Sequence, residues 1–315
     1  MVDLSIAIVN WNTKELLKAC LESIFEQTTG LDYEVWVADN GSSDGSAEMI
    51  KKEFPQVHLI ENITNVGFTK ANNRILRQSS GKYVLLLNSD TQIIGNAIKE
   101  LFGFMEAHPE AGAGGCQLLN RDGSLQSSCG RFPKLISIFF GGEIVNRFFR
   151  KIFKNRTFFA EYGLNENDHH SFQDVDFVKG CCIILRKSAL EKAGLLDENL
   201  FMYFEEMDLC YRIKQKGYKI LYGPQSKVLH LGGQSSRLFS ETVFRNLNSQ
   251  EYLFRKHYGN AQAFALKWVV AAGSLIRLPI YFLIFTLATN EKRILIRPKL
   301  IWNLYALKWF ARVLI

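Results

Sequence analysis

The sequence lacks three features that mark other classes of protein. Its six cysteines show no CxxC pair and no regular spacing, so a disulfide framework is not indicated and reduced thiols in the cytosol are favoured. No charged leader precedes an apolar run at the N-terminus, and we therefore expect no secretory signal peptide. The longest charge-free runs near the C-terminus, residues 268–276 and 278–290, hold nine and thirteen residues, fewer than the roughly 20 that a membrane-spanning helix needs.

What is present indicates a globular protein with an uneven charge. The chain has 315 residues, of which 47% are hydrophobic and 22% charged, which excludes a disordered protein and suits one large domain or two ordinary ones. The formal net charge is +7. Residues 255–315 hold ten basic residues and one acidic residue, and residues 147–156 hold five basic residues and no acidic one. The remaining chain is therefore acidic, and the basic excess lies in two apolar segments.

The first 120 residues alternate between apolar runs and helix-like stretches. This alternation predicts a parallel sheet built from βαβ units and buried on both faces. The predicted strands are residues 4–9, 33–39, 57–61 and 82–88, and the predicted helices are 14–27, 46–54, 68–79 and 96–108. After residue 120 the alternation ends. There we predict a loop at 121–133, a strand with a glycine kink at 175–186, a helix at 201–216 and short strands at 218–224 and 226–231.

Polar side chains follow three of the predicted strands, at the carboxyl ends where open α/β sheets bind ligands. An acid at a strand end, such as Asp39, can accept hydrogen bonds from the ring NH or the ribose hydroxyls of a nucleotide. Asp44, in the same turn, has a structural alternative, which is to cap the next helix. The three polar stretches are Asn10-Trp11-Asn12, residues 39–45 and Asn88-Ser89-Asp90.

Two positions are candidates for contact with a divalent cation. Asp90 follows a fully apolar strand, and hard cations such as Mg²⁺ and Mn²⁺ take oxygen ligands that they share with diphosphate oxygens. His230 also follows an apolar strand, and it begins a Gly/Ser-rich loop that extends to the basic residue Arg237. Such a histidine can contact the metal and the diphosphate.

The helix predicted at 201–216 carries three acids within four positions. Glu205 and Asp208 share a face, while Asp208 is also spaced to form an ion pair with Arg212. Glu205 and Glu206 are flanked by apolar residues. A carboxylate near apolar groups and a second acid has a raised proton affinity, as a general base requires.

Taken together and in this order, these segments resemble the family 2 glycosyltransferases with a GT-A fold, especially the bacterial rhamnosyltransferase-like subgroup. The resemblance covers about residues 4–236, and its specificity lies in the ordered set of motifs. The matching stretches are SIAIVNWN, VADNGSSDGS, NVGFTKANN, YVLLLNSDT, VKGCCIILRK, FMYFEEMDLCYR and VLHLGGQSS.

The resemblance implies a fold and a division of the chain. The fold is α/β, of the GT-A nucleotide-diphospho-sugar transferase type, with a mostly parallel central sheet flanked by helices. Residues 1–240 would form this domain, with a donor half at about 1–120 and an acceptor half at about 121–240. Residues 241–315 would form a basic, apolar, helical region that associates with a membrane.

The resemblance also implies roles for individual residues. Asp39 would hold the base or ribose, Asp90 would bind Mg²⁺ or Mn²⁺ where the family's DxD motif lies, and His230 would be the other contact to metal or diphosphate. Relatives read Glu-Asp where this chain has Glu205-Glu206, so Glu206 is the implied base, with Glu205 and Asp208 as substitutes. The implied nucleotide-sugar-binding residues are Asn10, Asn12, Asp39, Asn40, Asp44, Asn65, Gly67, Asn72, Asn88 and Ser89.

The activity implied is an inverting transfer of a sugar from a nucleotide-diphosphate donor, a dTDP- or UDP-sugar. The acceptor would be a hydroxyl of a lipid-linked or polysaccharide molecule in cell-surface glycan synthesis. L-Rhamnose is the first candidate for the sugar, and glucose, galactose and N-acetylglucosamine stay open. The alternative is a catalytically inactive nucleotide-sugar-binding protein at the membrane, since Asn88 and Glu206 depart from the fullest family pattern.

The C-terminal region differs in kind from the rest. Phe264–Thr289 is strongly apolar, although Lys267 and Arg277 interrupt it and Pro279 would kink a helix. We expect an interfacial or re-entrant membrane element, followed at 296–315 by a basic amphipathic helix whose aromatic residues suit the headgroup region. A partly buried pair of helices is the alternative.

The two basic segments bear on partners and location. Their bases lie among aromatic and aliphatic residues rather than along a polar face, which favours an anionic membrane surface over nucleic acid. We therefore expect peripheral or re-entrant association with the cytoplasmic face of the cell membrane, and no nucleic-acid partner.

Overall fold

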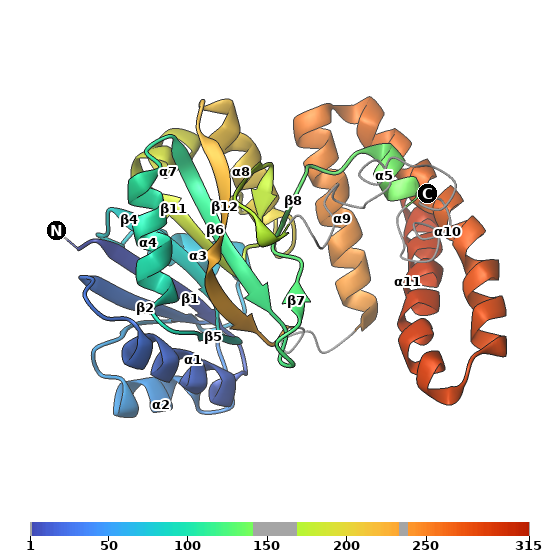
Figure 1. The fold of residues 1–315 in the computed structure, drawn as a ribbon. Helices are drawn as coiled ribbons and strands as arrows, with labels where there is room; N and C mark the ends of the chain where they lie inside the picture. The colour runs from blue at the N-terminus through green and yellow to red at the C-terminus, as the bar shows by residue number, and fades with distance from the viewer. Residues whose placement is uncertain (1, 141–168, 233–238, 315) are drawn as a thin grey trace. The chain divides into compact units, whose positions relative to one another are not determined.

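The computed structural model describes residues 2–140, 169–232 and 239–314. The chain forms two compact units, Met1–Arg131 with Glu166–Ser235, and Phe132–Asn165 with Ser236–Ile315. The first unit contains a sheet covered by helices, and the described part of the second is helical (Figure 1).

The parallel half of the sheet comes from the first 88 residues. β1 (Leu4–Asn10) lies between β2 (Tyr33–Asp39) and β4 (Tyr83–Asn88) and is parallel to both. β3 (His58–Glu61) pairs in parallel with β2. Because these strands are parallel and adjacent, their carboxyl ends meet at one edge of the sheet.

Six further strands complete the sheet, and they are β5 (Thr91–Ile93), β6 (Ala111–Leu119), β7 (Leu125–Gln126), β9 (Gln173–Val175), β11 (Cys182–Arg186) and β12 (Lys219–His230). β11 is antiparallel to β4 and to β6, and β12 is parallel to β6. β5 pairs in the antiparallel sense with the end of β12, and β7 does so with β6. A separate small sheet joins β8 (Cys129–Gly130) to β10 (Phe177–Val178).

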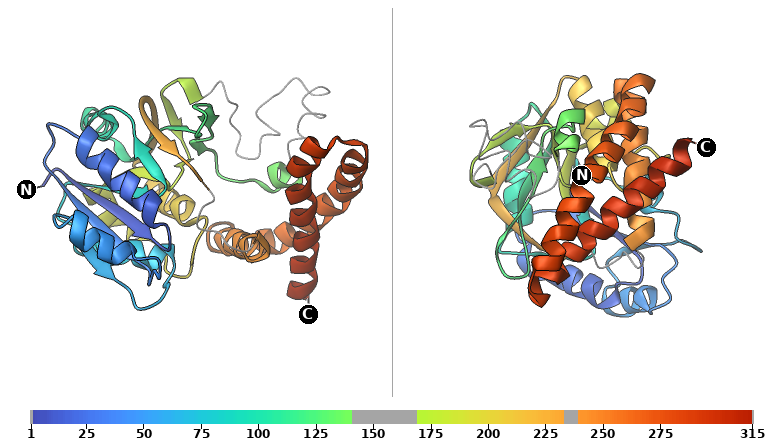
Figure 2. Two further views of the ribbon diagram at one scale, coloured as in Figure 1. Left: turned by 90° about the horizontal axis from the view of Figure 1, so that it is seen from below. Right: turned by 90° about the vertical axis from the view of Figure 1, so that its right-hand side faces the viewer.

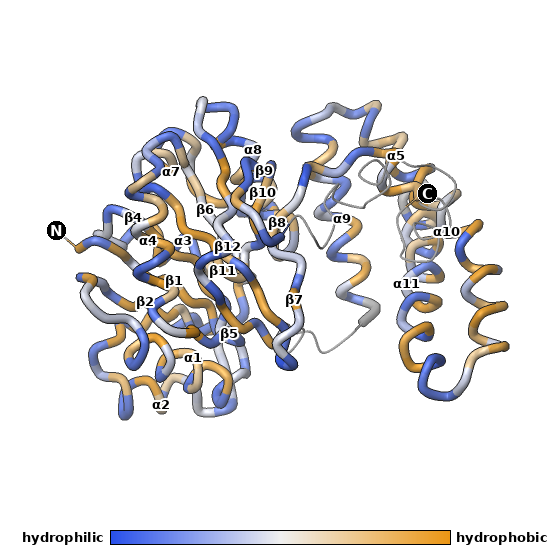
Figure 3. The backbone as a smooth tube through the Cα atoms, in the orientation of Figure 1, coloured by the Kyte–Doolittle hydropathy of each residue, from blue (hydrophilic) through white to orange (hydrophobic). Residues whose placement is uncertain are grey.

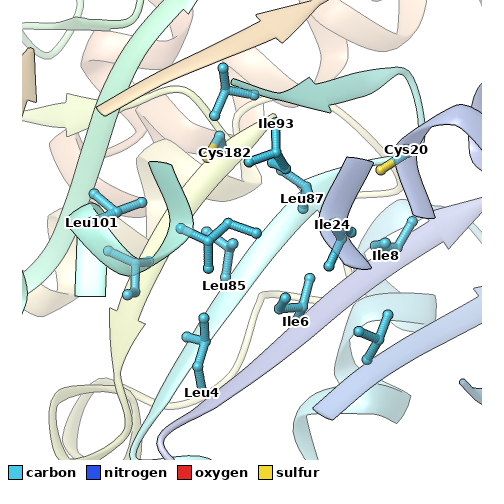
Figure 4. Close-up of a cluster of buried hydrophobic side chains, with 14 of the residues drawn as sticks. Leu4, Ile6, Ile8, Cys20, Ile24, Leu85, Leu87, Ile93, Leu101 and Cys182 are labelled. Atoms are coloured by element: carbon cyan, nitrogen blue, oxygen red, sulfur yellow. The ribbon is translucent and has the colours of Figure 1, made fainter. Parts of the chain in front are cut away.

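Helices cover the sheet of the first unit, and they are α1 (Lys14–Gln27), α2 (Ser46–Glu53), α3 (Phe68–Leu76), α4 (Ala97–Ala107), α7 (Lys187–Ala193) and α8 (Glu205–Gln215). Alternate residues of β1, namely Leu4, Ile6 and Ile8, belong to the core that the buried faces of α1 and α4 complete (Figure 4). The period of two arises because successive strand side chains point to opposite faces. This packing fixes the strand ends that carry the polar residues.

The predictions for the first 120 residues are confirmed to within a few residues at each end. The mixed α/β fold with a largely parallel first half is confirmed as well. Three predictions for the later segments are wrong. The segment 121–133 contains β7 and β8, and the expected strand at 175–186 is divided among the end of β9, β10 and β11. The two strands expected at 218–224 and 226–231 are one strand, β12, with an irregularity between Gly223 and Lys227. Pro224 lies within it and has no N–H to donate to a ladder.

The helix expected at 201–216 begins only at Glu205. Tyr203 and Phe204 have positive φ angles of 71° and 66°, so the chain cannot be helical there. The segment 201–204 is therefore a turn that leads into α8.

The second unit contains α5 (Leu135–Phe139), α9 (Phe239–Tyr258), α10 (Asn260–Leu287) and α11 (Asn290–Leu314). α10 and α11 fold back on each other as a helical hairpin (Figure 2). A core that includes Leu247, Leu266, Ala306 and Trp309 joins α9, α10 and α11. α10 is hydrophobic along most of its length, whereas the turn to α11 is hydrophilic (Figure 3). The charge-free runs of this segment are each too short to span a membrane, but they form one helix of 28 residues, and by length and composition alone α10 is long and apolar enough to cross a membrane.

Both charges that interrupt the apolar segment have partners within the second unit. Arg277 is buried, and its guanidinium donates to Asn303 Oδ1 at 3.1 Å and to the carbonyl of Phe139 at 3.0 Å. Lys267 Nζ lies 3.3 Å from Glu251 Oε1. The basic segment expected at 147–156 lies outside the described residues.

Candidate active site

Three polar strand ends lie side by side at one edge of the sheet. In the register of the parallel strands, Asn10 pairs with Asp39 and Val9 pairs with Asn88. The polar stretches after β1, β2 and β4 are therefore neighbours, as the sequence predicted from the βαβ pattern.

Asp39 is buried and held by three donors. The side-chain amide of Asn10 donates to Asp39 Oδ1 at 2.8 Å, and the Ser42 hydroxyl donates to the same oxygen at 2.6 Å. The Ser42 backbone N–H donates to Oδ2 at 2.9 Å. Donors to a carboxylate form short, strong hydrogen bonds. The carboxylate of Asp39 is thus fixed in one orientation at the end of β2.

Asn12 and Asp44 shape the loops beside Asp39. Asn12 has a positive φ of 53°, and its Oδ1 accepts the Ser43 backbone N–H at 2.8 Å. Asp44 accepts the backbone N–H groups of Lys14 and Ser46, which are the first residues of α1 and α2. Burial raises the pKa of Asp44, but a hydrogen bond from the Ser46 hydroxyl at 2.6 Å and the two backbone N–H groups outweigh it and hold the pKa below its ordinary value. Asp44 therefore caps two helices, which is the structural alternative that the sequence left open.

The turn after β3 joins the same cluster. The Asn40 side-chain amide lies 3.4 Å from Asn65 Oδ1 and 3.3 Å from the Gly67 carbonyl, and Asn65 Oδ1 accepts the Gly67 N–H at 3.0 Å. Asn72 is buried on α3, and its Oδ1 has no hydrogen-bond partner among the described residues. Of the ten residues predicted to bind the nucleotide sugar, Asn65 and Gly67 thus lie in the turn after β3 and Asn72 lies on α3, while Asn40, directly after β2, contacts that turn.

Gly67 allows a close approach between two distant segments. Its φ is +91°, and a Cβ at this position would lie 2.6 Å from the ring of Phe201. The backbone N–H of Phe68 donates to the Phe201 carbonyl at 2.9 Å. The turn before α8 is therefore fastened to the start of α3, and a side chain at position 67 would push them apart.

Asp90 and His230 come together because β5 pairs with the end of β12. His230 is opposite Thr91 in that ladder, and the Leu231 N–H donates to the Asp90 carbonyl at 2.9 Å. As a result, His230 Nε2 lies 3.4 Å from Asp90 Oδ1 and 3.4 Å from Asn88 Nδ2. The hydroxyl of Ser89, which lies between Asn88 and Asp90 in the sequence, forms a hydrogen bond of 3.0 Å with the Thr13 hydroxyl.

The donor set of Asp90 and His230 fits a divalent cation. Two ligand atoms bound to one octahedral ion at about 2.1 Å lie about 3 Å apart, and the observed separation of 3.4 Å is close to that. Within residues 2–140, 169–232 and 239–314, no group of three or more His, Cys, Asp and Glu side chains gathers at one point. Asp90 and His230 would by themselves offer two ligands, a number that suits Mg²⁺ or Mn²⁺ because these ions keep waters and bind substrate phosphates.

Glu205 and Glu206 differ in their surroundings although they are adjacent. Glu205 is 7% exposed, and its Oε2 has no hydrogen-bond partner in the described part of the chain. Burial and the charge of Glu206 raise the pKa of Glu205 well above its ordinary value. Burial also raises the pKa of Glu206, although nearby backbone N–H groups and the charge of Lys179 offset part of this rise. Glu206 is half-buried. It is the better placed of the two to exchange a proton with a bound molecule.

Asp208 has a different arrangement. It is fully buried, and its Oδ2 accepts from Arg212 Nε at 2.9 Å. Arg212 also donates to the backbone carbonyls of residues 193–195. The ion pair that the i, i+4 spacing offered is therefore present, and it connects α8 to the end of α7.

The structure adds residues that the motifs did not indicate. The Oε1 atom of Gln126 lies 2.7 Å from His230 Nδ1. It sits in a segment predicted as a loop, and a lone glutamine gives no sequence signal. Thr13 and Ser42 also contact the cluster, and only Ser42 belonged to a stretch singled out as polar.

This fold and its polar strand ends define a glycosyltransferase of the GT-A class. A mannosyltransferase from Pyrobaculum calidifontis, solved with GDP-Man and Mn²⁺, aligns with 100% of this chain and 89% of its own, at a TM-score of 0.61 and 15% identity. The model of the glycosyl transferase family 2 matches residues 5–194, and the chain belongs to that family. The resemblance found in the sequence is thereby confirmed.

Curated relatives support the rhamnosyltransferase-like subgroup. An N-acetylglucosaminyl-diphospho-decaprenol L-rhamnosyltransferase of Mycobacterium tuberculosis is 28% identical over 256 residues, which cover 77% of this chain and 81% of that protein. The rhamnosyltransferase WbbL of Escherichia coli K12 is 25% identical over 264 residues, covering 80% and 92%.

Proposed function

We propose that this protein transfers a sugar, with inversion, from a dTDP- or UDP-sugar to a hydroxyl of a lipid-linked or polysaccharide acceptor. The observation that carries the proposal is the meeting of Asp90 and His230, 3.4 Å apart, at the same end of the sheet as the buried Asp39. The mycobacterial relative is named for transfer of L-rhamnose to a lipid-linked sugar, which supports L-rhamnose as the first donor sugar to test.

The polar strand ends would bind the nucleotide. Asp39 is already fixed by Asn10 and Ser42, and its carboxylate would accept hydrogen bonds from the base or ribose. Asn40, together with the turn that holds Asn65 and Gly67, would lie beside the same nucleotide. Preformed polar groups lower the ordering cost of binding. Asn12, Asp44 and Asn72 would then act by shaping loops and helix ends as well as by contact.

Asp90 and His230 would hold Mg²⁺ or Mn²⁺. When bound, a divalent ion supplies positive charge that stabilises the leaving diphosphate. The mannosyltransferase solved with GDP-Man and Mn²⁺ and a GalNAc-transferase solved with UDP, GalNAc and Mn²⁺ support this assignment. Asn88, which contacts His230, and Ser89, which is hydrogen-bonded to Thr13, would hold the strand end beside the pair and contact the nucleotide sugar.

Glu206 would act as the general base. Its carboxylate takes the proton of the acceptor hydroxyl while the hydroxyl oxygen forms a bond to the anomeric carbon. The bond from that carbon to the diphosphate oxygen breaks, and its electron pair leaves with the nucleoside diphosphate. The raised pKa of Glu206 increases its proton affinity, which helps this transfer. Glu205 would keep its own proton and leave one charge on the pair.

The second unit would bind the membrane surface from the cytoplasmic side. The charges of Arg277 and Lys267 have partners inside the unit, so they do not oppose contact of α10 with lipid. Exposed apolar side chains on α10 and α11 provide the contact area, and flanking bases favour anionic lipids. These exposed residues are Phe264, Trp268, Leu275, Ile276, Ile280, Phe282, Leu283, Leu287, Ile294, Leu295 and Leu304.

A donor screen tests the function. The full chain is incubated with dTDP- and UDP-sugars, Mg²⁺ or Mn²⁺, and a polyprenyl-diphosphate sugar as acceptor, and nucleoside diphosphate release is measured. We expect release that needs the metal and rises with acceptor. Nucleotide binding without turnover for every donor and acceptor would instead indicate a nucleotide-sugar-binding protein.

A further inference from the structure

A chain of side-chain amides leads to His230 from the turn before β7. Asn120 Oδ1 accepts from Gln126 Nε2 at 2.9 Å, and Gln126 Oε1 lies 2.7 Å from His230 Nδ1. The turn itself is well braced, because the Ser124 hydroxyl and N–H both donate to Asp122 and the Asn120 N–H donates to the Ser124 carbonyl. Gln126 thus connects a rigid turn to one ring nitrogen of His230.

The contacts of Gln126 determine which way its amide points. Its nitrogen faces two oxygens, Asn120 Oδ1 at 2.9 Å and the His230 carbonyl at 3.4 Å. Asn120 is oriented in turn, since its own amide nitrogen faces the Ser124 hydroxyl at 3.0 Å and the Leu125 carbonyl at 3.4 Å. Amide orientations are assigned from such networks. The oxygen of Gln126 therefore faces His230 and can only accept.

An acceptor at His230 Nδ1 requires that this nitrogen carry hydrogen. In the neutral ring the lone pair then lies on Nε2, the nitrogen that faces Asp90 Oδ1 at 3.4 Å. Asn88 Nδ2 also lies 3.4 Å from Nε2. Because an amide nitrogen donates, this contact is consistent with a lone pair on Nε2. With the ring neutral, a carboxylate oxygen and an imidazole lone pair at this distance repel each other unless a cation lies between them, whereas a doubly protonated ring would form an ion pair with Asp90.

We propose that Gln126 is a positioning residue that holds His230 as its Nδ1–H tautomer, with Nε2 ready to bind a divalent cation together with Asp90. Asn120 acts one step further out by fixing the amide of Gln126. The inference rests on the proposed function in one respect, which is that Asp90 and His230 are the metal pair. Partners of this kind fix the orientation of ligating histidines in metal sites.

The test uses the full-length protein labelled with ¹⁵N-histidine, with the His230 signals identified from a His230→Asn variant. In the wild type at a pH where the ring is neutral, ¹⁵N NMR should show Nδ1–H. Gln126→Leu should shift the ring toward Nε2–H, and Gln126→Glu, which keeps an acceptor, should restore Nδ1–H. Mn²⁺ affinity, measured by electron paramagnetic resonance with and without UDP, should fall about 10- to 100-fold in Gln126→Leu and much less in Gln126→Glu.

Gln117→Leu is the matched control. Gln117 is a buried glutamine on the neighbouring strand β6, and its amide donates to the His169 carbonyl at 3.3 Å. The Gln117→Leu variant should change neither the His230 tautomer nor the Mn²⁺ affinity. An Nε2–H wild type, a wild type that binds no Mn²⁺, or equal losses in Gln117→Leu and Gln126→Leu would each overturn the inference. Correct tautomer and Mn²⁺ binding without turnover of any donor would overturn only the proposed function.

Discussion

Arg212 binds Asp208 through Nε and an η-nitrogen, each 2.9 Å from the same carboxylate oxygen of a fully buried side chain. The same guanidinium also donates to three consecutive carbonyls at the end of α7. The charge of Asp208 is therefore used in joining two helices, which sets it apart from Glu206, the acid of α8 that we propose as the base.

Asp208→Asn should act on stability. Removing one charge of a buried pair leaves the other uncompensated, and such changes cost about 3–5 kcal/mol. We expect that loss in urea unfolding, while the folded fraction keeps its rate of nucleoside diphosphate release. The matched control is Glu61→Gln, which breaks the exposed Lys51–Glu61 pair and should cost less than about 1 kcal/mol. A rate loss in folded Asp208→Asn would instead favour a catalytic role.

Glu206→Gln should act on the chemical step. A glutamine keeps the size of the side chain but cannot take the acceptor proton, and general bases contribute about 10²- to 10⁴-fold in rate. We expect a fall in kcat of that order, with donor binding unchanged in calorimetry. Glu206→Asp, which introduces the acid that the family pattern implies at this position, should keep part of the rate. If Glu206→Gln turned over donor as fast as the wild type, the base would be another residue.

Glu205→Gln should remove a pH dependence of stability. The pKa of Glu205 is raised from an ordinary value of 4.5, so above pH 4.5 the folded protein keeps a proton that the unfolded chain loses. The folded state then binds more protons, and its stability falls as pH rises through this range toward the folded pKa. Urea midpoints at pH 5 and pH 7.5 should show a smaller decline in Glu205→Gln. An identical decline in both proteins would mean that Glu205 is ionised when folded.

Asp39→Asn should weaken donor binding. A hydrogen bond to a charged group contributes about 1.5–3 kcal/mol, and the loss of the charge should raise the KM for the donor about tenfold or more with a smaller change in kcat. Asp32→Asn provides the control, because Asp32 is an exposed acid directly before β2 whereas Asp39 ends that strand. Equal KM values for the three proteins would exclude Asp39 from the donor site.

The double variant Phe282→Ser with Leu283→Ser should weaken membrane binding. These neighbours on α10 are 62% and 60% exposed, and each would contribute about 1.5–3 kcal/mol when fully buried. We expect at least about a tenfold loss of binding to anionic liposomes in flotation, with nucleoside diphosphate release from a soluble acceptor unchanged. Ile94→Ser, at an exposed position in the other unit, should bind liposomes like the wild type. Unchanged flotation of the double variant would locate the contact elsewhere.

The first half of the fold was predictable because its signals are local. β1, β2 and β4 are apolar on both faces, and the helices between them have clear apolar stripes. In contrast, β12 pairs with β6, which lies about a hundred residues earlier in the chain, across an irregularity at Gly223 and Lys227. No local pattern encodes such a pairing, and the two-residue strands β7 and β8 are too short to show one.

The site shows the same division. Motifs indicated Asp39, Asp90 and His230, because a polar residue directly after an apolar strand stands out. They did not show that Asp44 accepts hydrogen bonds from the first residues of two helices. Ser46 is two positions from Asp44, but Lys14 is 30 positions away, and no local pattern links residues so far apart. They also did not distinguish Glu205 from Glu206, because burial of neighbouring side chains depends on the turn at 203–204.

The close contact between Gly67 and Phe201 limits how this enzyme could be recombined with its relatives. The ring of Phe201 occupies the space that any side chain at position 67 would need, and Phe68 is hydrogen-bonded to the same residue. A chimera that exchanged only residues 1–120 would separate the two halves of this contact. A chimera designed to alter the choice of donor should therefore take the turn at 201–204 and the loop before α3 from the same parent protein.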